Sequence, residues 1–291
     1  MRSRRFVESL IALPIATALL SCNQQPESPS SVLSSDGVPI HYEVHGSGEP
    51  AVVFVHGWSC DRTYWDAQAP HFSQHYTVVT IDLAGHGESG VEREDWSMRA
   101  FGRDVAAVVE KLDLEQIVLV GHSMGGLVVA EAARLLGDRV KVVVGADTFG
   151  DVSGRITDEQ KEAFLQPFGD DFRTSMDGMV RNNFFVPSSD STFIAGIAAD
   201  MASAPPDVAI GALSGYMDWY NNESETALRE LPAPLRLINS DYTPTNVEAG
   251  RAATSSFDVV LMSGVGHFVM MEDPETFNRL LGEIVAEFAG T

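Results

Sequence analysis

The sequence contains few cysteines and few basic residues. Its 291 residues include 2 cysteines, Cys22 and Cys60. Cys22 belongs to an N-terminal leader-like segment, so Cys60 is left without a partner and the fold has to be stabilised by its core rather than by a disulfide. Lys and Arg number 19 against 41 Asp and Glu, which gives a net charge of −22. This charge argues against nucleic acid or an anionic membrane as a partner of the folded surface.

Long apolar runs, internal repeats and low-complexity blocks are also missing. The apolar run at residues 10–20 is too short to span a bilayer, and it follows a basic start that contains Arg2, Arg4 and Arg5. Such a segment is typical of a signal peptide. Ser21-Cys22 at its end resembles a bacterial lipobox, which implies a leader at 1–21, a lipid on Cys22 and an extracytoplasmic location. An ordinary secretory signal is the alternative. Residues 22–35, rich in Ser, Pro and Gln, are predicted to form a flexible tether.

The remaining composition, 44% hydrophobic and 21% charged, suits one large globular domain or a core with an insertion. Continuous apolar segments of strand length alternate with amphipathic segments of helix length. This alternation predicts an α/β fold, a mostly parallel sheet with helices on both faces. The predicted strands are residues 38–44, 51–55, 76–81, 117–120, 140–144, 235–238 and 257–262. The predicted helices lie at 62–73, 97–112, 127 onward, 245–253 and 273 onward.

The alternation is interrupted between about residue 150 and residue 231. Four amphipathic segments and no strand are predicted there, at residues 158–168, 171–185, 191–202 and 207–220. We therefore expect a helical lid inserted into the core, which itself comprises residues 36–149 and 232–291.

Ser123 is the candidate nucleophile. It lies in Gly121-His122-Ser123-Met124-Gly125, which matches G-x-S-x-G between an apolar strand and an Ala-rich helix. A sharp strand-to-helix turn would expose the serine hydroxyl above the sheet. The backbone N–H groups at the start of the helix would face the same place.

The chain resembles the α/β-hydrolase superfamily through five motifs in order. These are His56-Gly57, Asp82-x-x-Gly85-His86-Gly87-x-Ser89, the Ser123 motif, Asp241 and Gly266-His267-Phe268. The resemblance implies that Ser123 is the nucleophile, His267 the base and Asp241 the acid that orients the base. Asp147, after the strand at 140–144, is the alternative acid.

The resemblance also implies an oxyanion hole made by the backbone N–H groups of Trp58 and Met124. His56, His86 and Asp82 are expected to be structural, and Cys60 a buried small residue. No metal site is expected because the histidines and carboxylates lack metal-ligand spacing, and no cofactor is implied.

The predicted function is a serine hydrolase that cleaves a carboxylic ester of a small molecule through an acyl-enzyme. The alternatives within this scaffold are a carbon–carbon bond hydrolase of ring-fission diketones and a perhydrolase of the haloperoxidase type. A ligand receptor on the same fold is a further alternative. The sequence sets neither the substrate nor the oligomeric state.

Overall fold

The computed structural model describes residues 30–290 of the chain. The predicted leader, Cys22 and most of the predicted tether therefore lie outside the described residues. Eight strands form one sheet in the order β1-β2-β4-β3-β5-β6-β7-β8. They are β1 (Ser30–Leu33), β2 (Pro39–His45), β3 (Ala51–Val55), β4 (Val78–Ile81), β5 (Ile117–His122), β6 (Val140–Ala146), β7 (Leu235–Ser240) and β8 (Phe257–Met262).

The sheet is parallel from β4 to β8 and antiparallel at β1 and β2. Every residue of β3, β4 and β5 is buried, as expected of strands that are covered on both faces. These strands are rich in valine and isoleucine, whose branched side chains pack well on a pleated surface. The predicted α/β architecture is confirmed.

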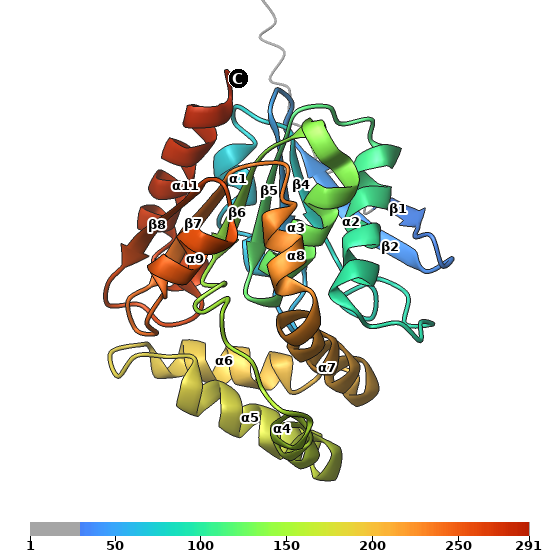
Figure 1. Cartoon of the computed structure of the whole chain (residues 1–291), viewed down its shortest axis with the longest axis vertical. Coiled ribbons are helices and arrows are strands. Elements are labelled where there is room, and N and C mark those ends of the chain that lie inside the picture. The colour runs from blue at the N-terminus through green and yellow to red at the C-terminus, as the bar shows by residue number, and fades with distance from the viewer. Residues whose placement is uncertain (1–29, 291) are drawn as a thin grey trace, which may run out of the picture.

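Helices cover both faces of the sheet (Figure 1). On one face α2 (Met98–Lys111) packs against α3 (Met124–Leu136), and α3 lies against β5 and β6. The other layer contains η1 (Arg62–Trp65), α1 (Ala69–Phe72) and α11 (Pro274–Phe288). In that layer the buried Gln68 amide donates to the Asn278 side chain at 3.0 Å. The helices α9 (Val247–Ala253) and α10 (Val269–Glu272) fill the connections around β7 and β8.

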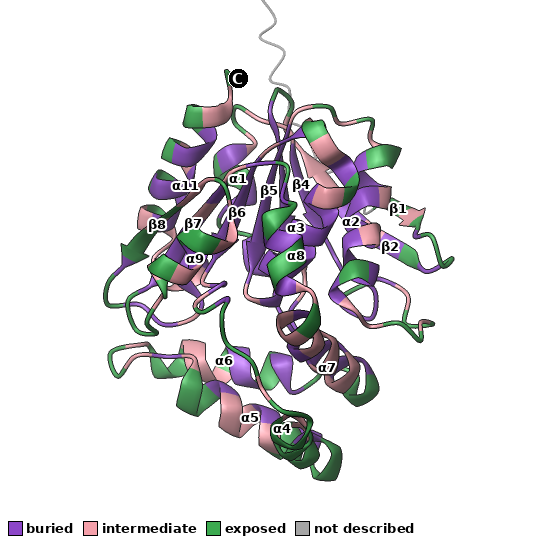
Figure 2. Cartoon of the chain, viewed as in Figure 1, coloured by how far each residue is buried: buried purple, intermediate pink, exposed green. Residues whose placement is uncertain are grey.

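The lid lies between β6 and β7, where the sequence predicts it. It consists of α4 (Asp158–Asp170), α5 (Phe172–Asn183), α6 (Ser191–Met201) and α7 (Pro206–Asn222), and α8 (Ser224–Arg229) leads back to the core. The lid helices lie together beyond the carboxyl ends of the parallel strands (Figure 1). The helices α5, α6 and α7 each have a buried face, whereas α4 is mostly exposed (Figure 2). No single helix of residues 30–290 is long and apolar enough to cross a membrane, although α6 and α7, bent by 99°, pass that test as a pair.

The predicted tether is wrong at its C-terminal end, because residues 30–33 form the edge strand β1. Only Val32 of this strand is partly buried, and the other three residues are exposed. The strand exists through backbone pairing with β2, from Ser30 opposite Tyr42 to Leu33 opposite Pro39. A polar edge strand of this kind has no hydrophobic period of its own, so its sequence resembles a loop.

Candidate active site

Ser123 lies on the predicted strained turn between β5 and α3. Its φ of 52° and ψ of −118° are sparsely populated for a residue with a side chain. A Cβ on Gly121 would collide with the backbone of Gly125, and one on Gly125 would lie 2.5 Å from the His56 carbonyl oxygen. The two glycines therefore allow the tight turn that holds Ser123 in this conformation.

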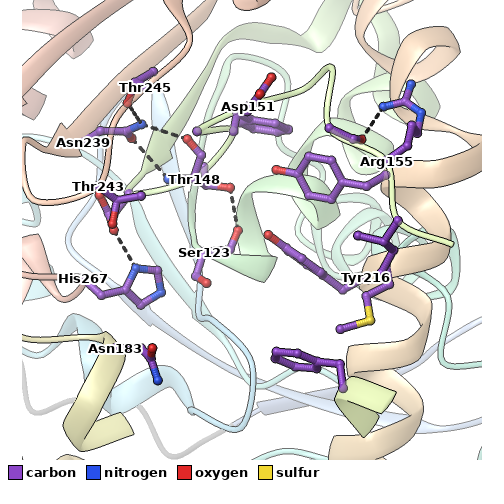
Figure 3. A pocket seen from close by; sticks show the side chains of 18 of the residues that line it. Ser123, Thr148, Asp151, Arg155, Asn183, Tyr216, Asn239, Thr243, Thr245 and His267 are labelled. Carbon is purple, nitrogen blue, oxygen red and sulfur yellow. Dashed lines mark hydrogen bonds and ion pairs between the residues drawn. The ribbon is translucent and has the colours of Figure 1, made fainter. Parts of the chain in front are cut away.

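Ser123 and His267 both line a cavity of about 650 Å³ at the carboxyl edge of the sheet. In Figure 3 both side chains face this cavity, which separates the sheet from the lid. The lid contributes mostly large side chains, among them Phe164, Phe184, Tyr216, Met217 and Tyr220. The site is therefore a concave pocket in which a few polar groups of the core face an aromatic roof.

Asp147 holds the imidazole of His267. Its Oδ2 lies 2.6 Å from His267 Nδ1, and both side chains are largely buried. A carboxylate can only accept a hydrogen bond, so the proton of the neutral ring is on Nδ1. Nε2 is then the unprotonated nitrogen that can take a proton from a hydroxyl group. The other Asp147 oxygen accepts from the Ser240 backbone N–H at 2.7 Å.

The predicted acid, Asp241, does not reach His267, and this assignment is wrong in the structure. The exposed Asp241 carboxylate accepts instead from Ser263 Oγ at 2.6 Å. Its backbone N–H donates to the Met262 carbonyl at 2.9 Å, which continues the pairing of β7 with β8 and directs Asp241 toward the β8 loop. Asp147 directly follows β6 in a left-handed conformation with φ 46°. That bend directs its carboxylate across β7 to His267, so the structure selects the alternative acid.

The predicted oxyanion donors belong to loops that meet at Ser123. A Cβ on Gly57 would lie 3.3 Å from Ser123 Cβ, which places the Gly57-Trp58 peptide beside the serine. Within residues 30–290 the backbone N–H groups of Trp58 and Met124 make no hydrogen bond. The Trp58 indole donates to the Ala209 carbonyl of α7 at 2.7 Å, so the lid anchors this loop.

The sequence motifs did not predict two further groups beside Ser123, Thr148 and Asn239. The Thr148 hydroxyl donates to the Ser123 carbonyl at 2.8 Å. The Asn239 amide in turn accepts from Thr148 N at 3.2 Å and donates to Thr148 O at 2.9 Å. Both residues lie at the carboxyl ends of neighbouring parallel strands, and that position is the signal that could have identified them.

His56 and His86 are structural, as predicted. Burial lowers the pKa of His56 to about 4 and that of His86 to about 3, so both rings are neutral near pH 7. His56 accepts from the Leu83 N–H at 3.0 Å, and His86 Nδ1 donates to the Ala84 carbonyl at 2.9 Å. Burial also raises the pKa of the Cys60 thiol, which removes its nucleophilic thiolate form.

His122 has a larger role than its place in the motif suggests. Its Nε2 donates to the His267 carbonyl at 3.0 Å, and the two rings lie 4.7 Å apart. Burial keeps the pKa of His122 well below its ordinary value, so the ring remains a neutral donor. Asp82 is buried and accepts from the backbone N–H groups of Arg62 and Glu88, which makes it a structural support of its loop. No group of three metal-ligating side chains occurs in the described part of the chain.

Residues 52–280 match the model of the alpha/beta hydrolase family. The chain belongs to this family. A non-heme chloroperoxidase from Streptomyces lividans is 32% identical over 204 residues, 69% of this chain and 64% of that protein. The bifunctional epoxide hydrolase 2 of Sus scrofa is 34% identical over 131 residues, 44% of this chain and 23% of that protein. These curated relatives are therefore matched over less than two thirds of their length.

Solved structures share the architecture. A thermophilic esterase from Thermogutta terrifontis superposes with a TM-score of 0.78 at 25% identity, over 90% of this chain and all of that one. Its agreement covers both the sheet and the lid region, since the match extends over nearly the whole described chain. Family membership and this match establish an α/β-hydrolase with esterases among its structural neighbours.

Proposed function

We propose that the protein is a serine hydrolase that cleaves the carboxylic ester of a small molecule. The observation that carries the proposal is the arrangement of Ser123, His267 and Asp147 at one cavity. A serine hydroxyl becomes a nucleophile when a base takes its proton. The base in turn needs an acid that fixes its tautomer and stabilises its charged form, and the Asp147–His267 hydrogen bond supplies this.

The reaction follows from these positions. Ser123 Oγ attacks the ester carbonyl carbon while its proton passes to His267 Nε2, and the carbonyl oxygen becomes an oxyanion. The N–H groups of Trp58 and Met124 are proposed to stabilise that charge, each by about 3 kcal/mol. When the intermediate collapses, the alcohol leaves with the proton from His267. Water then attacks the acyl-enzyme, gives its proton to His267 and releases the acid, which regenerates the Ser123 hydroxyl.

A cavity of about 650 Å³ with an aromatic roof suits an ester with a short to medium acyl chain. We expect kcat/KM on a series of p-nitrophenyl esters to be highest for short to medium chains and to fall for long ones. The measurement is steady-state hydrolysis across the series, beside lactones and a ring-fission diketone. Turnover of the diketone without ester hydrolysis would contradict the proposal. A burst of one equivalent of product without turnover would indicate a receptor.

Perhydrolysis is the second candidate activity, and the match to a chloroperoxidase favours it. The same acyl-enzyme would be attacked by hydrogen peroxide in place of water, which releases a peracid. Both activities share the formation of the acyl-enzyme and differ in the molecule that attacks it. Peracid formation, measured after peroxide is added to the preferred ester, therefore separates them.

The location of the protein is proposed from the leader-like segment, which lies outside the described residues. We propose that the mature chain begins at Cys22 and carries a lipid there, on an extracytoplasmic membrane face. Cys22→Ala is expected to release the protein from the membrane fraction or to block its maturation, because it removes the only acceptor of the lipid. Fractionation of cells that express each form measures this. A variant that is processed to the same size as the wild type and still stays in the membrane fraction would rule out the anchor.

A further inference from the structure

The loop that carries His267 is in direct contact with the lid. The backbone N–H of His267 donates to the carbonyl of Phe184, the residue that follows α5, at 2.7 Å. A Cβ on Gly266 would collide with that same carbonyl oxygen, and it would lie 2.8 Å from Phe185 Cα. Glycine at position 266 therefore allows the two backbones to approach each other this closely.

The Phe184 side chain also contacts the imidazole. The two ring centroids are 4.7 Å apart, with an angle of 30° between the rings. The same imidazole lies 4.7 Å from the His122 ring and is bound at Nδ1 by Asp147. The neighbouring Phe268 ring lies 5.4 Å from it as well. Three rings and one carboxylate thus restrict the imidazole, and of these four groups Phe184 is the one that comes from the lid.

A carboxylate provides a second connection between the lid and this loop. Glu272 Oε1 accepts from the Gly266 N–H at 2.9 Å, and its Oε2 accepts from the Ser189 hydroxyl at 2.6 Å. Ser189 lies between α5 and α6, so this carboxylate bridges the lid and the His267 loop. Phe185 stacks on Phe268 with centroids 5.6 Å apart. Residues 266, 267 and 268 are therefore all attached to the lid.

We infer that Phe184 is a positioning residue for His267, so that the lid holds the base as well as covering the cavity. The inference rests on the proposed function, which assigns His267 the role of base. The His267 loop has no regular secondary structure between β8 and α10, so its conformation depends on such contacts. Proton transfer requires Nε2 within hydrogen-bond reach of Ser123, and a displacement of about 1 Å can cost about 100-fold in rate.

Phe184→Leu tests the inference, because it removes the ring and keeps a side chain that can fill part of the space. We expect kcat on p-nitrophenyl acetate to fall by about 10- to 100-fold with little change in KM, since the loss concerns the base rather than binding of a small ester. Phe184→Tyr keeps the ring and is expected to retain most of the wild-type kcat. Phe193→Leu is the matched control. The ring centroid of Phe193 lies 5.7 Å from that of Phe185 in the lid, but Phe193 does not line the cavity.

The hydrogen bond from His267 Nδ1 to Asp147 gives a readout that needs no substrate. We expect its proton to resonate far downfield in the NMR spectrum of the free protein, and its loss in His267→Gln identifies the signal. Loss of the Phe184 ring current alone shifts this signal, so the quantity to compare is the rate at which the proton exchanges with water. We expect faster exchange in Phe184→Leu and an unchanged rate in Phe193→Leu. This result stands even if esters are not the substrate, so the two proposals fail separately. An exchange rate that Phe184→Leu leaves unchanged, or a kcat no lower than that of Phe193→Leu, would overturn the inference.

Ser189→Ala tests the second connection at a partly exposed position, where little effect on folding is expected. It removes the lid end of the Glu272 bridge and leaves the bond to the Gly266 N–H intact. A smaller fall in kcat than for Phe184→Leu, together with faster exchange of the Nδ1 proton, supports the inference. An unchanged exchange rate and an unchanged kcat would show that the bridge has no part in positioning His267.

Discussion

Ser123→Ala is expected to lower kcat on the preferred ester by about 10⁶-fold, since it removes the group that forms the acyl-enzyme. The Cys60 thiol cannot take its place, because Cys60 does not line this cavity and burial raises the pKa of the thiol. The fold should persist. Alanine differs from serine by one oxygen, and both residues carry the same Cβ at the left-handed φ of 52°.

The measurement is kcat for wild type and variant, with circular dichroism to confirm folding. Cys60→Ala is the matched control, since it removes a buried thiol that does not line this cavity and is expected to retain activity. A folded Ser123→Ala protein with wild-type turnover would remove the nucleophile assignment and the acyl-enzyme mechanism with it.

Asp147→Asn is expected to lower kcat by about 10⁴-fold while the protein remains folded. The asparagine amide can donate to the imidazole, which would leave the ring proton on Nε2, where it cannot accept from Ser123. Asparagine keeps an oxygen that can accept from the Ser240 N–H, so the packing at the end of β7 is preserved.

Asp241→Asn is the matched comparison, because it makes the same change one strand away. The Asp241 carboxylate is exposed and accepts from Ser263 rather than from His267, so we expect kcat within about twofold of wild type, as for other surface changes. Both variants are to be checked by circular dichroism. A dead but folded Asp241→Asn beside an active Asp147→Asn would return the acid to Asp241.

The motifs around the nucleophile could be interpreted without a structure because they are local. The run from Ile117 to Gly126 contains its own strand, its tight turn and the start of its helix. The lid helices could be predicted for the same reason, because an amphipathic period is also a property of neighbouring residues. The structure adds their caps, such as Thr157 and Asp190, which lie beside the helices that they begin. Strand β1 and the short helices α8 and α10 were not predicted, because short segments show no clear period.

The choice of acid could not be made from local pattern. Asp147 and Asp241 each follow a core strand, and both strands belong to the same parallel sheet. Which carboxylate meets His267 depends on where each strand leaves the sheet. Asp241 continues the pairing with β8, whereas the backbone at Asp147 bends into a left-handed conformation.

The α/β class, the inserted lid and the candidate nucleophile could be predicted from the sequence, because strand and helix periods and one strained turn are properties of neighbouring residues. The candidate base followed from the resemblance of the Gly266-His267-Phe268 motif to the family. The contacts of His267 with Asp147, Phe184 and His122 could be seen only in the folded protein. These contacts join residues 120, 83 and 145 positions apart in the chain (267 − 147, 267 − 184 and 267 − 122). The packing of β6, β7 and the lid brings them together, and no short sequence pattern encodes such a distance.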